Sequence, residues 1–453
     1  MIFPRPSRPA PIAPAPVRAP RQPAWSGPWA PGVAAAVGPA PLLVRLMMSL
    51  FIIVIYSRLI EIVPVRPLPQ VGLALLLYGL LTSRWMDWLT GTPTLLLLAL
   101  TAWMVPSALV GDWPGGSIQM IMDTWSRLLL YYLIVACLGR GLAGVQSLMS
   151  SVAWATAALV LMGLFQPGHA GVRYGIAGSS MDNPNELAAA LVLALPFCGW
   201  YVLGSGRPKV LRLVLLAVTV CALVMLFRTG SRMGLLVLVS IVIVLLVIVR
   251  GKARLLLSGA ALAVSLAGIV LTPKAIEQRY ETIVDKNVEG AEGNVDVSHA
   301  NGSSEARWSL LVTSLRVTAQ HPVFGVGLGN FQGENASLTK RSGEQVSWQV
   351  AHNSYTQISS ECGIPGALIY LGLIVYCLRT TNRLRKAMAA NPELRAHAPM
   401  AFGLFVESVV FALCAMFSSG FAYGFNLPLL AATVLSLERF AGGVLARPAT
   451  SPT

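Results

Sequence analysis

The chain has 453 residues, of which 55% are hydrophobic and only 11% are charged, and its mean hydropathy is +0.66. A soluble globular domain carries about 25% charged residues, so this composition excludes an ordinary soluble protein. The formal net charge of +14 does not indicate nucleic-acid binding, because membrane proteins collect Lys and Arg in cytoplasmic loops and this chain has no basic stripe interleaved with aromatic residues.

The first segment of the chain is rich in proline. Residues 1–41 hold twelve prolines, four arginines and no acidic residue. Such a segment cannot form an apolar core, so we expect a disordered cytoplasmic tail.

Apolar runs from residue 42 onward are long enough, with their flanks, to cross a bilayer as α-helices. The sequence therefore predicts an all-α polytopic membrane protein, with a transmembrane domain over 42–440 and a cytoplasmic tail over 441–453. We expect about twelve spans, at residues 42–62, 68–82, 93–110, 126–139, 147–165, 187–204, 209–227, 233–250, 253–272, 363–379, 400–418 and 421–440.

The basic residues predict the orientation of these spans. With the N-terminus in the cytoplasm, 20 of the 33 lysines and arginines lie on that side. Residues 273–353 then form one long periplasmic loop, which is too long to be a simple connection and should contain short helices. Apolar residues at helical spacing predict one such helix over 305–320, able to lie on the membrane surface. The other predicted outer segments are 166–186, 227–233 and an acidic turn around 111–123.

The outer segment 166–186 carries the first motif. Arg173 precedes Asp182-Asn183-Pro184-Asn185-Glu186, in which we expect Asn185 to cap the following helix. Taken alone, Arg173 is most simply interpreted as a solvated loop charge.

The second motif is the short turn from Arg228 to Gly234. Arg228 and Arg232 interrupt spans that are otherwise free of charge. Snorkelling to the membrane interface would explain them. However, the turn also opens a helix, whose free N–H groups favour an anion, and the planar fork of arginine suits phosphate oxygens.

The third motif is Ala351-His352-Asn353-Ser354-Tyr355, which follows His321-Pro322 and a glycine run and precedes Gly363-Ile364-Pro365-Gly366. A neutral imidazole at a membrane surface can take a proton from a hydroxyl near neutral pH, although a surface or capping histidine would fit the same pattern. The glycine run, Gly325-x-Gly327-x-Gly329, lacks the spacing of a dinucleotide-binding motif and predicts tight turns or close backbone packing.

Cysteines and possible metal ligands are not clustered. The six cysteines are scattered and lie mostly inside apolar spans, so we expect buried apolar residues rather than disulfides. No group of His, Cys and carboxylate residues has convincing metal-ligand spacing, and we expect neither a metal nor another cofactor.

In this order, the three motifs resemble the O-antigen ligase and polymerase superfamily of bacterial envelope glycan enzymes, over roughly residues 165–380. The resemblance implies a metal-independent glycosyltransferase of the bacterial inner membrane that uses an undecaprenyl-diphosphate-linked glycan at its periplasmic face. It implies that Arg173 and Arg232 bind the diphosphate and that His352 is the catalytic base. The supporting candidates are Arg228, Asn185 and Asn353.

The acceptor stays open at this stage. It could be the lipid A core in a ligase, a growing polysaccharide in a polymerase, or a side chain in a protein O-glycosylase. The local motifs do not separate ligases from polymerases, and we favour the ligase narrowly. The alternative of another class is a transporter or flippase of lipid-linked sugars, which predicts charges at the bilayer midplane within broken helices. The expected partners are the lipid-linked glycan, its acceptor and membrane lipids, without nucleic acid.

Overall fold

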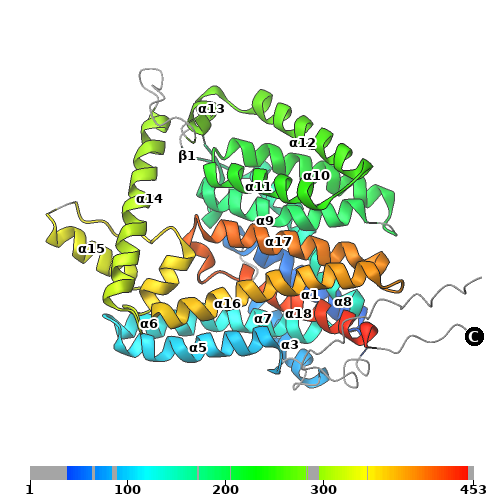
Figure 1. Cartoon of the computed structure of the whole chain (residues 1–453), viewed down its shortest axis with the longest axis horizontal. Helices are drawn as coiled ribbons and strands as arrows, with labels where there is room; N and C mark the ends of the chain where they lie inside the picture. The colour runs from blue at the N-terminus through cyan, green and yellow to red at the C-terminus, as the bar shows by residue number, and fades with distance from the viewer. Residues whose placement is uncertain are drawn as a thin grey trace, which may run out of the picture.

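A computed structural model describes residues 38–63, 67–83, 89–170, 173–204, 206–281, 283, 295–343 and 345–446. Long helices run side by side along the molecule, and one helix, α14, stands across them at one end, on the left in Figure 1. The predicted tail over 1–41 and the predicted C-terminal tail lie largely outside the described residues.

The described part of the chain is overwhelmingly helical, as its apolar runs predict. Eight helices are long and apolar enough to cross a membrane, and four shorter apolar helices accompany them in the described residues. This confirms a helical polytopic membrane protein. The helices of the first third are α1 (Leu42–Tyr56), α2 (Leu59–Ile62), α3 (Leu68–Thr82), α5 (Thr92–Val110), α6 (Pro114–Met120), a π-helical turn (Ile121–Trp125), α7 (Ser126–Leu138) and α8 (Gly141–Phe165).

The middle of the chain contains a hairpin and four helices. The antiparallel hairpin pairs Pro167 with Ile176 and Ala170 with Arg173. The elements are β1 (Pro167–Ala170), β2 (Arg173–Ile176), a 3₁₀ turn (Ser180–Asp182), α9 (Pro184–Leu203), α10 (Lys209–Arg228), α11 (Arg232–Ile248) and α12 (Lys252–Leu271).

The segment predicted as a long loop folds into helices, as expected. They are α13 (Lys274–Glu281), α14 (Val295–Gln320) and α15 (Phe331–Arg341). The predicted helix over 305–320 is the second half of α14, and its apolar residues Trp308, Val312 and Leu315 are exposed. The chain ends with α16 (Ser354–Ala390), a 3₁₀ turn (Arg395–His397), α17 (Ala398–Ala415), a second 3₁₀ turn (Ser419–Phe421) and α18 (Asn426–Leu445).

The core lies where α8, α9, α17 and α18 meet. In the most apolar window of α9, 72% of residues are buried, against 28% in α10, although α10 is more hydrophobic. Exposed leucines and valines cover the outer face of α10 to α12, including Val210, Leu213 and Leu255. This distribution is typical of helices that face lipid, because the bilayer rather than the protein interior removes these side chains from water.

Two predicted boundaries are wrong. The span predicted over 42–62 breaks after Tyr56, where Arg58 adopts φ 58°, before α2 begins. The predicted acidic turn around 111–123 is much shorter, because α6 begins at Pro114. The span predicted to open at Gly363 corresponds to the second part of α16, which follows the kink at Gly363, where φ is 69°; the first part of α16 begins at Ser354.

The kink in α16 has a clear cause. Pro365 lacks an N–H group, so the carbonyl of Glu361 loses its partner within the helix. Ser107 Oγ of α5 and the backbone N–H of Gly327 both donate to this carbonyl, at 2.8 and 3.0 Å. Trp103 of α5 donates to the next carbonyl, that of Cys362, at 2.9 Å. The backbone carbonyls that the kink leaves without a partner in the helix therefore accept hydrogen bonds from neighbouring elements.

Most cysteines behave as the sequence predicts. Cys137, Cys198, Cys362, Cys377 and Cys414 are buried free thiols. Cys221 is also a free thiol but is exposed on α10.

Candidate functional site

Arg173 is fixed between two other sequence motifs. It begins β2, and its Nε donates to the carbonyl of Thr229 at 2.9 Å. Its Nη2 donates to Asn185 Oδ1 at 3.0 Å, and the same oxygen accepts from Ser231 Oγ at 3.0 Å. Arg173 is therefore not a freely solvated loop charge, because it joins the hairpin to the starts of α9 and α11.

Asn185 does not cap α9, in contrast to the sequence prediction. Asn183 is the cap, and its Oδ1 accepts from the backbone N–H of Asn185 at 3.0 Å. Pro184 occupies the first helical position, where its missing N–H group costs nothing. This shift by two residues frees the side chain of Asn185 to hold Arg173 and Ser231.

The turn before Arg232 opens a helix, as predicted. Ser231 caps α11 by accepting from the N–H of Gly234 at 3.3 Å. Thr229 and Ser231 are both buried. Arg232, the first residue of α11, is half-buried and lies close enough to two other arginines, Arg279 and Arg307, for their positive charges to act on it.

Arg279, from α13, covers this turn. It was not identified as a site residue from the sequence. Its Nε donates to the carbonyl of Gly230 at 3.0 Å, and only 6% of the residue is exposed. The neighbouring Tyr280 donates from its hydroxyl to the carbonyl of Phe227 at 2.9 Å. Burial raises the pKa of Tyr280 above its ordinary value, although the charges of Arg173 and Arg279 act in the opposite direction.

Arg307, from α14, was also missed. Burial and the positive charge of Arg279 lower the pKa of its guanidinium below the ordinary value. Arg173, Arg232, Arg279 and Arg307 thus come from four separate elements and form a cluster of positive charge, which we call the arginine cluster. No local pattern distinguishes Arg279 and Arg307 from the solvated basic residues of the same long segment.

His352 lies at the edge of this cluster. It is half-buried and has a φ of 53°, in the left-handed region that few non-glycine residues adopt. Burial, and then the charge of Arg307, lower the pKa of His352 below its ordinary value. The imidazole is therefore neutral at neutral pH, which is the form that accepts a proton.

The residues that flank His352 fix its backbone. Asn353 Oδ1 accepts from the N–H groups of Tyr355 and Thr356 at 3.0 and 3.2 Å and so caps α16. Ser354 Oγ donates to the carbonyl of Ser418 at 2.6 Å, and Ser418 Oγ donates to Glu186 Oε1 at 3.2 Å. Glu186 follows Asn185, so this hydrogen-bonded path connects the His352 segment to the residue that holds Arg173.

The other two supporting candidates, Arg228 and Asn353, make contacts within the protein. Arg228 is exposed, and its guanidinium carbon lies 5.6 Å from the ring centroid of Tyr174. Its position fits a cation–π contact at the edge of the hairpin. Asn353 uses its side-chain oxygen as a helix cap.

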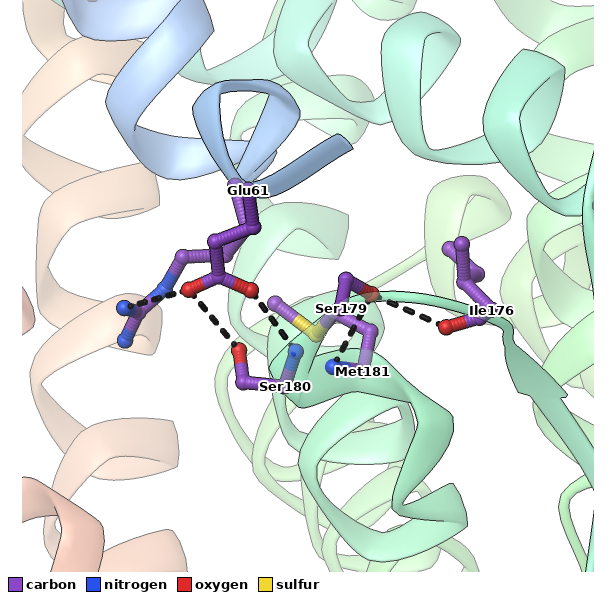
Figure 2. A network of polar contacts seen from close by, with 6 residues as sticks. Glu61, Ile176, Ser179, Ser180 and Met181 are labelled. Carbon is purple, nitrogen blue, oxygen red and sulfur yellow. Dashed lines mark hydrogen bonds and ion pairs between the residues drawn. The ribbon is translucent and has the colours of Figure 1, made fainter. Parts of the chain in front are cut away.

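Glu61, from α2, holds the turn that connects Arg173 to Asn185 (Figure 2). Its carboxylate accepts from the backbone N–H of Ser180 at 2.7 Å and from Ser180 Oγ at 3.2 Å. Ser179 Oγ donates to the carbonyl of Ile176 at 2.9 Å and accepts from the N–H of Met181 at 3.2 Å. Sequence reasoning missed Glu61, because its partner Ser180 lies far along the chain.

Among the residues that the structure describes, no group of three or more His, Cys, Asp or Glu side chains could hold a metal ion. The charged groups that do converge are the arginines, which are suited to an anion such as a phosphate or diphosphate.

Fold and site together define a polytopic helical membrane protein with an arginine cluster beside a neutral histidine at one end of its helix bundle. Residues 217–371 match the family model described as O-antigen ligase, which supports the predicted resemblance to the O-antigen ligase superfamily. The matched region contains Arg232, Arg279, Arg307 and His352, whereas Arg173 precedes it. No curated protein matches the chain. This match supports a general role in glycan transfer at a membrane.

Proposed function

We propose that this protein transfers a glycan from an undecaprenyl-diphosphate carrier to an acceptor hydroxyl at the periplasmic face of the inner membrane. The observation that carries the proposal is the meeting of the arginine cluster with His352. A diphosphate leaving group needs positive charge, and an acceptor hydroxyl needs a base. Both requirements are met by residues that come together from four elements and from the segment before α16.

The arginine cluster supplies the electrostatic part of the reaction. As the bond between the anomeric carbon and the diphosphate oxygen breaks, negative charge grows on the diphosphate. Guanidinium groups stabilise this charge most strongly where water is scarce, and Arg279 is almost fully buried. The N-terminus of α11, which begins at Arg232, adds the partial positive charge of its free N–H groups.

His352 acts as the general base. Its neutral imidazole takes the proton of the acceptor hydroxyl while the hydroxyl oxygen bonds to the anomeric carbon. The bond to the diphosphate breaks in the same displacement, and the carrier leaves as undecaprenyl diphosphate. A single direct displacement inverts the anomeric centre. The chemistry of this step needs only the side chains named here and no metal or other cofactor.

We favour the lipid A core as the acceptor, with a growing polysaccharide as the alternative. The same site would serve both, because the arginine cluster and His352 act on the donor and on a hydroxyl rather than on the rest of the acceptor. The transporter alternative is less favoured, because it requires charges at the bilayer midplane, and the arginines cluster at one end of the helix bundle.

We further infer that the shorter apolar helices also cross the bilayer with their flanking residues, which gives about twelve spans. Together with the basic residues around 380–398, this topology puts the arginine cluster on the periplasmic side.

The envelope polysaccharide of a deletion strain tests the proposed function. For a ligase, we expect lipid A core without long glycan and an accumulation of carrier-linked glycan. For a polymerase, we expect lipid A core capped by single repeats. A deletion strain with unchanged envelope glycans would refute glycan transfer altogether.

A further inference from the structure

The segment that carries His352 is held by a buried glutamine. Gln357 lies in the first turns of α16 and is only 4% exposed. Its Oε1 accepts from the backbone N–H of Ala351 at 2.9 Å, and its Nε2 donates to Glu361 Oε1 at 2.5 Å. One amide thus joins the residue before His352 to the next turn of the helix.

Glu361 is fully buried and joins two further segments to this glutamine. Glu361 Oε1, which accepts from Gln357, also accepts from the backbone N–H of Phe331, the first residue of α15, at 3.3 Å. Its Oε2 accepts from the hydroxyl of Tyr423, between α17 and α18, at 2.5 Å. The carboxyl group therefore lies where α15, α16 and the α17–α18 connection meet.

The backbone around Glu361 reinforces this junction. The N–H of Val326 donates to the carbonyl of Ser360 at 2.9 Å, and the N–H of Ile364 donates to the carbonyl of Pro322 at 2.8 Å. At Gly325 a side chain would overlap the backbone of Glu361, and at Gly363 it would overlap the carbonyl of Val323. Close backbone packing, one of the two predicted roles of the glycine run, is confirmed here.

We propose that Gln357 and Glu361 are positioning residues that set the place of the His352 imidazole through the backbone of Ala351. This inference rests on the proposed function, in which His352 is the base. His352 has a left-handed backbone conformation, which persists only where the surroundings hold it. The surrounding hydrogen bonds reach both of its neighbours, at Ala351 through Gln357 and at Asn353 through the cap of α16.

A positioning role makes a specific prediction for conservative and disruptive variants of Glu361. In Glu361→Gln, the amide oxygen still accepts from Gln357 and Phe331, and the amide nitrogen donates to the Tyr423 hydroxyl, which can also accept. The junction is therefore kept, and most of the activity is kept with it. In Glu361→Ala, the donors on Gln357, Phe331 and Tyr423 lose their acceptor, and transfer falls.

Gln357→Leu tests the contact with Ala351 directly. Leucine has a similar size but can neither accept from Ala351 nor donate to Glu361. Because a displacement of about 1 Å can cost 10²-fold in rate, we expect kcat to fall about 10- to 100-fold. The apparent KM for the donor should change less than about threefold, because the arginine cluster is untouched.

The assay uses the carrier-linked glycan extracted from the producing cells. It is added to membranes of the deletion strain, which contain the native acceptor and one plasmid-borne variant, and the release of undecaprenyl diphosphate is measured. Thr381→Val is the matched control, because it removes a buried hydrogen bond on the same helix, from Thr381 Oγ1 to the carbonyl of Cys377, far from His352. If Gln357→Leu reaches the membrane in low amounts, Gln357→Met takes its place.

The outcomes separate the two proposals. If His352→Ala transfers glycan normally, the proposed function fails. If His352→Ala is impaired but Gln357→Leu matches Thr381→Val, only the positioning role is overturned. If Glu361→Gln loses as much activity as Glu361→Ala, the carboxyl group acts chemically and the positioning role is also overturned. A fall in kcat for Gln357→Leu, with activity kept in Glu361→Gln, supports the inference.

Discussion

His352 combines three properties that a general base in this position needs. It is half-buried, its backbone is held in a left-handed conformation, and its pKa is lowered by burial and by Arg307. General-base assistance typically contributes about 10²- to 10⁴-fold to a rate. We therefore expect His352→Ala to lower transfer by that order while the donor still binds, as measured by single-turnover assays at saturating donor. Normal transfer would show that another group takes the proton.

The lowered pKa of His352 predicts the pH dependence of the reaction. Only the neutral imidazole accepts a proton, so activity is present above the pKa and is lost as the pH falls through it. Because the pKa is lowered, this loss occurs below the ordinary histidine value of about 6.5. In Arg307→Gln one repelling charge is removed, so the pKa rises and the acidic limb of the kcat–pH profile moves to higher pH. A limb that does not move would mean that Arg307 does not act on the base.

The arginine cluster gives a prediction with an internal control. Arg307 and Arg316 both lie on α14, but Arg307 belongs to the arginine cluster, whereas Arg316 is exposed. Charged hydrogen bonds are worth roughly 1.5–3 kcal/mol each, so we expect Arg307→Ala to lower kcat/KM about 10- to 100-fold. Arg316→Ala should stay close to the wild type. Equal effects of the two variants would indicate a general loss of charge rather than a specific site.

At the scale of the elements, the kink in α16 decides where the glycine run and α15 lie. At Gly363 the backbone φ is 69° and a side chain would overlap the carbonyl of Val323. With ψ at −178°, this is a conformation that essentially only glycine adopts, and it costs another residue about 1–3 kcal/mol before any overlap is counted. We expect Gly363→Ala to lower the melting temperature and the amount of folded protein in the membrane.

Gly372 is the matched control for this variant. It lies on the same helix, but an added Cβ would meet its nearest neighbour, Leu96, at 3.7 Å, an ordinary contact. Gly372→Ala should therefore be nearly neutral in the same melting experiment. If Gly363→Ala were equally neutral, the kink would not be the rigid joint that its hydrogen bonds indicate.

At the scale of the whole molecule, the proposed function depends on which side of the membrane the arginine cluster faces. Lys340 on α15 and Lys386 near the end of α16 are both exposed. In the proposed topology they lie on opposite sides of the membrane. In a Cys221→Ala background, Lys340→Cys should react with an impermeant maleimide in intact spheroplasts. Lys386→Cys should react only after the membrane is permeabilised. The reverse pattern would put the site in the cytoplasm and refute a periplasmic reaction.

The sequence by itself determined the class of the protein and the place of its motifs. Long apolar runs form helices because a bilayer leaves no other partner for the backbone, so the helical membrane fold is encoded locally. The turn before Arg232 could be located for a similar reason, since charged and turn-forming residues interrupt an apolar pattern. The start of α9 was predicted less well, because Asn183 and Asn185 are both able to cap a helix.

Only the tertiary structure decided how these motifs work together. Arg279 and Arg307 look like solvated charges in the sequence, and burial against other elements makes them part of the arginine cluster. Glu361 joins the start of α15 to the segment of His352 through partners that lie up to 62 positions away. Such contacts depend on which helix ends meet, and hydropathy and spacing carry no information about that meeting.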